Sequence, residues 1–234
     1  MAISPQDIHP ALWRGTQLGA RTGPTVSTGH ATLDAELPGA GWPVGALTEL
    51  LVRAHGIGEV RLLQPALASA SPDRPVVLLH PPFRPNALCW SGWNLPAQRL
   101  LCIDTGRDRD TWWAAEQVLR HNCCAALILW ADPIRVPELR RLHLAAQSGE
   151  ALFFMFRPLA MRDQASPAAL RLALAPQAQG IRVSILKRRG PACAQPIDVA
   201  LTDDGQFTDP GHVPLDRPVP AQPQPGRVAP AVAH

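Results

Sequence analysis

Five short, almost wholly apolar segments, separated by stretches of helical periodicity, constrain the fold of this chain more than any other feature. These segments are Ala46–Val52, Pro75–His80, Arg99–Asp104, Ala125–Trp130 and Ala151–Phe156. Helical patterns occupy residues 57–69, 110–121 and 137–148. A continuously apolar strand must be covered on both faces, whereas an alternating strand can leave one face in water. The pattern therefore predicts an α/β fold with a mostly parallel sheet and helices on both of its faces.

The pattern changes toward the C-terminus. Three later segments alternate with period two and lie close together: Ala169–Ala175, Gly180–Gly190 and Pro196–Leu201. They predict two or three antiparallel strands added at the C-terminal edge of the sheet. We expect three regions: an N-terminal helix and linker at 1–26, a core at 27–205, and a disordered Pro-rich tail at 206–234. A further short helix is expected at 30–37, with Ser27 or Thr28 as its N-cap.

Composition narrows the class of protein. A net charge of +3 with 18% charged residues permits contact with nucleic acid but gives no concentrated basic surface. The five cysteines show no C-x-x-C spacing, so we expect reduced thiols on strands and no metal site. The beginning of the chain lacks a signal-peptide pattern, and no apolar run reaches the roughly 20 residues of a membrane span. These features predict a cytoplasmic protein without membrane contact.

The loop after the first apolar strand lies where α/β folds place a phosphate-binding loop. A working P-loop reads G-x-x-x-x-G-K-[ST], in which glycines admit the phosphates, the lysine neutralises them and the hydroxyl holds Mg²⁺. Here Gly58 fits the second glycine, but Arg53 stands in place of the first. Glu59 replaces the lysine and Val60 replaces the hydroxyl residue. A carboxylate at that position would repel a triphosphate.

The second nucleotide element also departs from its pattern. The strand Ala125–Trp130 should end in an aspartate that holds Mg²⁺, but Asp132 comes two residues late. No nucleophile pattern accompanies His55, Glu59 and Asp132, so they do not suggest an acid–base site. We therefore expect no enzyme activity, no catalytic residue, no cofactor, and no nucleotide on the degenerate loop. The residues of that loop are His55, Gly56, Gly58, Glu59 and Val60.

The order of several motifs is similar to that of a known family. Residues 27–51, STGHATLDAELPGAGWPVGALTELL, resemble the entry to the RecA recombinase core, and residues 182–201 resemble its final strands. With the loop degenerate, the chain more closely resembles the ImuA family of RecA-like, SulA-related proteins, over roughly residues 8–203. The motifs that carry this resemblance are HPALWRG (9–15), PPF-x-P (81–85), DTWWAAEQVLR (110–120) followed by ALILW, and LKRRGP (186–191).

The resemblance implies a RecA-like core and an accessory role in DNA repair. Members of the family belong to damage-inducible operons of the SOS response and act in error-prone translesion synthesis, hence in mutagenesis. The implied partners are an ImuB-like protein and an error-prone DNA polymerase alpha subunit, with RecA as a further candidate. A SulA-like cell-division inhibitor that binds FtsZ is the alternative. A genuine ATPase is a third, and Glu59 argues against it.

Two groups of residues are candidates for contact with a partner or with DNA. Trp112 and Trp113 are adjacent, so one should pack in the core while the other is exposed as an interaction anchor. Lys187, Arg188 and Arg189 form a basic turn that could contact DNA phosphates or an acidic partner, or could be simply a solvated hairpin tip. Trp90 and Trp93 lie in a Pro-rich loop, which we expect to be clamped over the sheet rather than to form a partner site.

Overall fold

The computed structural model describes residues 23–106, 108–130, 133–193 and 195–201. The expected N-terminal helix at 5–20 and the tail at 206–234 lie outside these residues. The strands are β1 (Thr25–Val26), β2 (Trp42–Pro43), β3 (Leu47–Val52), β4 (Val76–Leu79), β5 (Leu100–Ile103), β6 (Ala126–Trp130), β7 (Leu152–Pro158), β8 (Leu170–Gln177), β9 (Gly180–Lys187) and β10 (Ile197–Ala200). The helices are α3 (Ala31–Asp34), α4 (Glu59–Ser69), α5 (Ala87–Gly92), α6 (Asp108–Arg120) and α7 (Val136–Ala146), with short 3₁₀ turns η1 (Ala97–Arg99) and η2 (Leu159–Asp163).

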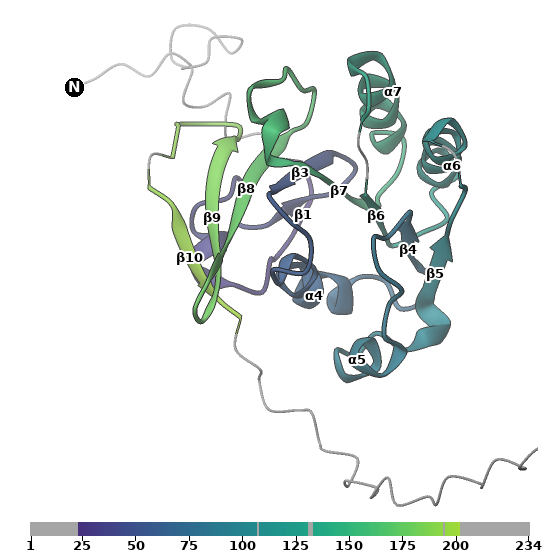
Figure 1. Ribbon diagram of the computed structural model, residues 1–234, viewed down its shortest axis with the longest axis horizontal. Helices are drawn as coiled ribbons and strands as arrows, with labels where there is room; N and C mark the ends of the chain where they lie inside the picture. Colours follow the sequence, from purple (N-terminus) through teal and green to yellow (C-terminus); the bar gives the residue numbers. More distant parts are fainter. Residues whose placement is uncertain (1–22, 107, 131–132, 194, 202–234) are drawn as a thin grey trace, which may run out of the picture. The chain divides into compact units, whose positions relative to one another are not determined.

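One large sheet organises these elements, in the order β10-β9-β8-β3-β7-β6-β4-β5 (Figure 1). The six strands from β8 to β5 are parallel to one another, and β9 is antiparallel to both β8 and β10. A separate antiparallel pair joins β1 to β2. The mostly parallel sheet predicted from the apolar segments is confirmed, with β3 near its centre.

The prediction of two or three antiparallel strands at the C-terminal edge is confirmed, since β9 is antiparallel to both β8 and β10, but β8 is also joined to the parallel part of the sheet. β8 pairs with β3 in parallel, with Thr48 opposite Leu170 and Val52 opposite Leu174. After β7 the chain passes through η2 and a loop before β8 begins, which gives it the length to return to the starting end of the sheet. Parallel pairing requires a long crossover of this kind, whereas a tight hairpin forces antiparallel pairing.

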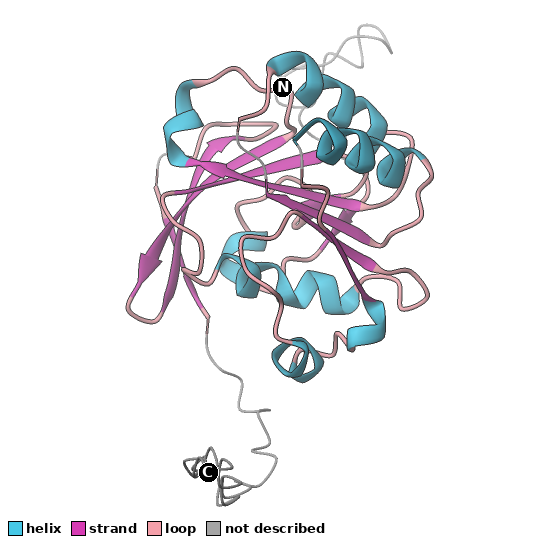
Figure 2. Ribbon diagram, turned by 45° about the vertical axis from the view of Figure 1, so that its right-hand side comes forward, coloured by secondary structure: helices cyan, strands magenta, loops and turns pink. Residues whose placement is uncertain are grey.

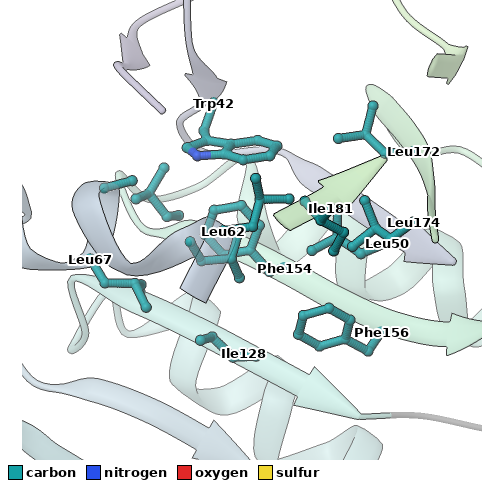
Figure 3. Packing of buried hydrophobic residues seen from close by; sticks show 14 of the residues in the cluster. Trp42, Leu50, Leu62, Leu67, Ile128, Phe154, Phe156, Leu172, Leu174 and Ile181 are labelled. Carbon is teal, nitrogen blue, oxygen red and sulfur yellow. The ribbon is translucent and has the colours of Figure 1, made fainter. Parts of the chain in front are cut away.

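Helices cover both faces of the sheet (Figure 2). On one face, side chains of α3 and α4 pack with Trp42, Leu50, Phe154 and Phe156 (Figure 3). Trp42 meets Phe154 edge to face, with ring centroids 5.3 Å apart. On the other face, α6 and α7 cover a second cluster that includes Leu47, Phe153 and Met155. The alternation of strand side chains between these two clusters explains why almost every residue of β3, β6 and β7 is buried.

The helix predicted at 137–148 corresponds to α7, which is amphipathic. Leu139, Leu142 and Ala146 are buried, while Arg140 and Arg141 are exposed. No helix among the described residues is long and apolar enough to cross a membrane.

Three local predictions need correction. The helix expected at 30–37 is shorter and covers only α3. Its N-cap is His30 rather than Ser27 or Thr28, because the Ser27 hydroxyl (2.6 Å) and the Thr28 N–H (2.8 Å) both donate hydrogen bonds to Asp34. The loop expected at 86–93 contains α5, whose first turn is capped by Asn86.

The cysteines are free, as expected, but their positions differ from the prediction. Only Cys102 lies on a strand, in β5, while Cys89 lies in α5 and the others lie in turns and loops. Cys124 is buried, and this burial raises the pKa of its thiol to about 12.

Candidate functional site

The loop between β3 and α4 is held by two glycines in the left-handed conformation. Gly56 has φ 86° and Gly58 has φ 96°, values that residues with a Cβ rarely adopt. A Cβ on Gly58 would also lie 2.9 Å from the side chain of Leu201, which follows β10. The loop therefore turns sharply from the central strand into the helix, as a phosphate-binding loop does.

The Glu59 carboxylate closes this loop from inside. The backbone N–H of Gly56 donates to both of its oxygens, at 2.8 Å and 3.1 Å. Glu59 is the first residue of α4 and is only 3% exposed. His55 Nδ1 lies 3.8 Å from the same carboxylate. A negative charge at a helix N-terminus is stabilised by the helix dipole, so Glu59 supplies internally the anion that such a loop would otherwise accept from a ligand.

The end of β6 presents an aromatic residue where the corresponding strand of a nucleotide-binding protein ends in a magnesium-binding carboxylate. Trp130 is buried and stacks on Phe156, with ring centroids 5.3 Å apart. Its indole N–H has no hydrogen-bond partner among the described residues. Asp132 lies outside the described residues.

A cleft of about 500 Å³ adjoins the closed loop at the carboxyl ends of β3, β4 and β6. Open α/β sheets commonly bind ligands in this position. Its wall includes Arg84 and Phe83, whose ring is 67% exposed. Arg61 also lines the cleft, but its guanidinium donates to the carbonyl of Leu201 at 2.9 Å.

Trp90 and Trp93 serve the core, as the sequence reasoning favoured. Trp90 is buried in the cluster beneath α4, and Trp93 packs against that cluster. Their rings lie 5.5 Å apart with planes inclined by 57°. α5 is thereby fixed over the sheet rather than offered as an aromatic docking surface.

The two adjacent tryptophans of α6 separate as predicted. Trp112 is half-buried against the core beneath α6, whereas Trp113 is 64% exposed. Both line a groove of about 1090 Å³ between α6 and α7. In this groove Glu116 is buried and paired with Arg120 (2.8 Å) and with Arg141. An exposed tryptophan beside a satisfied ion cluster is a suitable anchor for a protein partner.

The basic turn is largely exposed, as the alternative of a solvated tip predicts, but two of its side chains make contacts within the fold. The Lys187 ammonium donates to the carbonyl of Ser166 at 2.8 Å. Arg188 binds Pro191 O at 2.7 Å and the Glu36 carboxylate at 3.1 Å, and its side chain is 14% exposed. Arg189 is exposed and takes no part in these contacts of Lys187 and Arg188. Arg188 is thus paired with a carboxylate, whereas Lys187 is tied only to a neutral carbonyl and keeps its charge, as does the exposed Arg189.

A buried charge cluster escaped the sequence reasoning. Glu49, in the middle of β3, is fully buried and accepts bonds from Arg171 (2.7 Å), Arg157 (3.3 Å) and the Ser166 hydroxyl (2.7 Å). The signal was one charged residue inside an otherwise apolar strand, since buried carboxylates require partners. No described group of three or more His, Cys, Asp or Glu side chains could hold a metal ion.

Together these features define a mostly parallel α/β protein whose loop between β3 and α4 is closed by its own Glu59 and whose groove between α6 and α7 carries an exposed tryptophan. No protein-family model matches the sequence, and no curated protein matches it either.

Proposed function

We propose that this chain is a non-catalytic accessory protein with a degenerate RecA-like core, which acts in error-prone translesion DNA synthesis during the SOS response. Its partners are an ImuB-like protein and an error-prone DNA polymerase alpha subunit, and its place of action is the cytoplasm. The motif order resembling the ImuA family supports the identity of the process. The mostly parallel sheet, with a loop and helix following its central strand, is compatible with that core.

The observation that carries the non-catalytic part of the proposal is the bond between Glu59 and the Gly56 N–H. A nucleotide phosphate at this loop would have to displace a buried carboxylate or lie beside it. The lysine and hydroxyl that favour a triphosphate are absent from the two positions that follow Gly58. A protein built in this way acts by binding other proteins.

The groove between α6 and α7 is the surface that we assign to the partner. It combines an exposed aromatic anchor with arginine side chains, the residue types that dominate the energetics of interfaces. The exposed basic residue Arg189 gives at most a weak contact to DNA, because its two neighbours are engaged within the fold.

The test is an affinity purification of the tagged full chain from its own host cells after DNA damage, with bound proteins identified by mass spectrometry. We expect an ImuB-like protein and an error-prone polymerase. The Trp113→Ala variant should bind the purified partner about tenfold more weakly or worse, because interface tryptophans commonly contribute 2 kcal/mol or more. Phe83→Ala is the matched control, since Phe83 is an equally exposed aromatic residue outside the groove.

The outcomes separate the alternatives. Recovery of FtsZ without polymerase components would contradict the translesion role and indicate a cell-division inhibitor. Equal losses of affinity in Trp113→Ala and Phe83→Ala would contradict the groove as the partner surface. A variant lacking residues 207–234 shows in the same assay whether the last segment contributes to binding.

A further inference from the structure

A small pocket lies at the amino ends of β3 and β8. The loop between β3 and α4 lies at the opposite, carboxyl ends of the strands. Its volume is about 160 Å³. Its polar side chains are His143 from the last turn of α7, Gln147 at the C-cap of that helix, Arg189 in the turn after β9, and Thr25 of β1, whose hydroxyl donates to the carbonyl of Gly39. Its remaining wall is largely apolar or backbone and includes Pro43, Ala46, Ala169 and Leu170.

The charge around this pocket has one sign. None of the described residues that line it is acidic. Arg189 is exposed, and no ion pair or hydrogen bond engages its guanidinium among the described residues. Burial lowers the pKa of His143, and the nearby charges of Lys187 and Arg189 lower it further. The pocket is therefore a positively charged recess that lacks a counter-ion from the described part of the chain.

One hydrogen-bonding group in the pocket wall has no partner. The Nδ1 atom of His143 is buried and makes no hydrogen bond among the described residues, while its Nε2 lies 3.2 Å from the Gln147 amide. That nitrogen is covered by protein, so the groups that could face a ligand are the side chains that line the pocket. A recess lined by a guanidinium, an imidazole, an amide and apolar side chains has the form of a small-ligand site.

We propose that this pocket binds a carboxylate carried on a short aliphatic body, with Arg189 as the residue that pairs with the charge. The guanidinium matches a carboxylate bidentately, and the apolar wall receives the attached carbon chain. The ligand is either a free small acid or the terminal carboxylate of a polypeptide partner, which present the same chemistry. This site is independent of the proposed role in translesion synthesis.

The dimensions distinguish this ligand from nucleic acid. A cavity of about 150 Å³ holds a molecule the size of benzene. An internucleotide phosphate carries a sugar on each side and could not enter a pocket of this volume. Binding to DNA also needs several free cations in a row, whereas Lys187 and Arg188 are held by Ser166, Glu36 and Pro191.

The experiment is a titration of the purified full chain, followed by NMR of its histidine side chains. The probes are pentanoate, its uncharged analogue pentanamide, the peptide acetyl-Ala-Ala-Leu with a free C-terminus, and the same peptide as its C-terminal amide. We expect pentanoate to shift the His143 signals and to raise the His143 pKa, since a bound anion stabilises the imidazolium. Arg189→Gln should weaken binding about tenfold or more.

Arg84→Gln is the matched control, because it also removes one exposed arginine charge, but from the cleft at the carboxyl ends of β3, β4 and β6. It should leave the affinity for pentanoate unchanged. Binding of pentanoate and the free peptide identifies a polypeptide terminus as an acceptable source, and binding of pentanoate alone identifies a free acid. The proposal is overturned if pentanamide binds as well as pentanoate, if Arg189→Gln has no effect, or if a single-stranded oligonucleotide shifts His143 more strongly than pentanoate does.

Discussion

The Glu59 carboxylate and the Gly56 N–H show how one side chain can decide the chemistry of a whole loop. In a nucleotide-binding loop, the backbone N–H groups are kept for phosphate oxygens. Here the side chain of Glu59, the residue after Gly58, folds back and accepts a hydrogen bond from one of these groups, the N–H of Gly56. The loop turns as sharply as a phosphate-binding loop does, while its anion is covalently part of the chain.

A first prediction concerns this bond. Glu59→Ala should lower the free energy of unfolding by about 2 kcal/mol, because it removes a charged hydrogen-bond acceptor and a favourable helix-dipole interaction. The measurement is urea denaturation followed by circular dichroism. Glu138→Ala is the control, since Glu138 also lies in the first turn of a helix but has a carboxylate oxygen without a partner among the described residues.

The comparison between these two variants isolates the loop contact, because both lose a similar interaction with a helix dipole. If Glu59→Ala is no less stable than Glu138→Ala, then the bond to Gly56 contributes nothing to the fold. In that case the closed loop would be an incidental conformation.

At the scale of elements, the strand pattern was sufficient to predict most of the sheet. Segments such as Ala125–Trp130 are apolar throughout, and their boundaries match β6 and its neighbours within one or two residues. The direction of β8 could not be predicted, because period-two alternation is the same for parallel and antiparallel strands. The degenerate loop was predictable because its motif is contiguous, whereas the Glu59 contact depends on the φ angles of Gly56 and Gly58.

The Glu49 cluster escaped prediction for a related reason. Arg157 and Arg171 lie 108 and 122 residues away from Glu49 along the chain, and only the pairing of β7 and β8 with β3 brings them together. A lone glutamate in an apolar strand signals that partners exist. It does not signal which residues they are.

A second prediction concerns this cluster. Glu49→Gln should destabilise the protein by about 3–5 kcal/mol, because it leaves two arginine side chains buried without a counter-charge. Asp198→Asn is the control, since its partner Arg182 forms an exposed pair, and exposed pairs contribute little. The midpoints of urea unfolding give the comparison.

Glu49→Gln could fall close to the limit of total stability, which is typically about 5–15 kcal/mol. A variant that replaces the whole cluster, with Glu49→Leu, Arg157→Met and Arg171→Met, keeps the result interpretable. It should be more stable than Glu49→Gln, because no buried charge then lacks a partner. A less stable triple variant would show that the cluster contributes through its geometry rather than through charge balance.

At the scale of the whole molecule, a third prediction concerns pH. Burial lowers the pKa of both His30 and His143 below the usual histidine value of 6.5. Below pH 6.5 the unfolded chain therefore binds more protons than the folded chain, so stability falls as the pH decreases through this range. The Arg182 guanidinium holds the pKa of Asp198 at about 2, so that group stays ionised in the folded chain above pH 5.

We expect a lower urea midpoint at pH 5 than at pH 7.5, measured at constant ionic strength. A double variant, His30→Gln with His143→Gln, should show a smaller difference between the two pH values than the unmodified chain does. An unchanged difference in the double variant would assign the pH dependence to other groups.

The position of β3 has a consequence for the order of events during translation. β3 is complete once residue 52 has left the ribosome, but its neighbours β7 and β8 end at residues 158 and 177. While residues 53–158 are synthesised, a fully buried strand of the protein therefore has two unpaired edges, and one of them stays unpaired until β8 is complete. Nascent chains of this kind fold late and slowly, because their stabilising contacts join distant residues. A shortened chain ending before residue 170 should remain dependent on chaperones, since its central strand would lack β8 permanently.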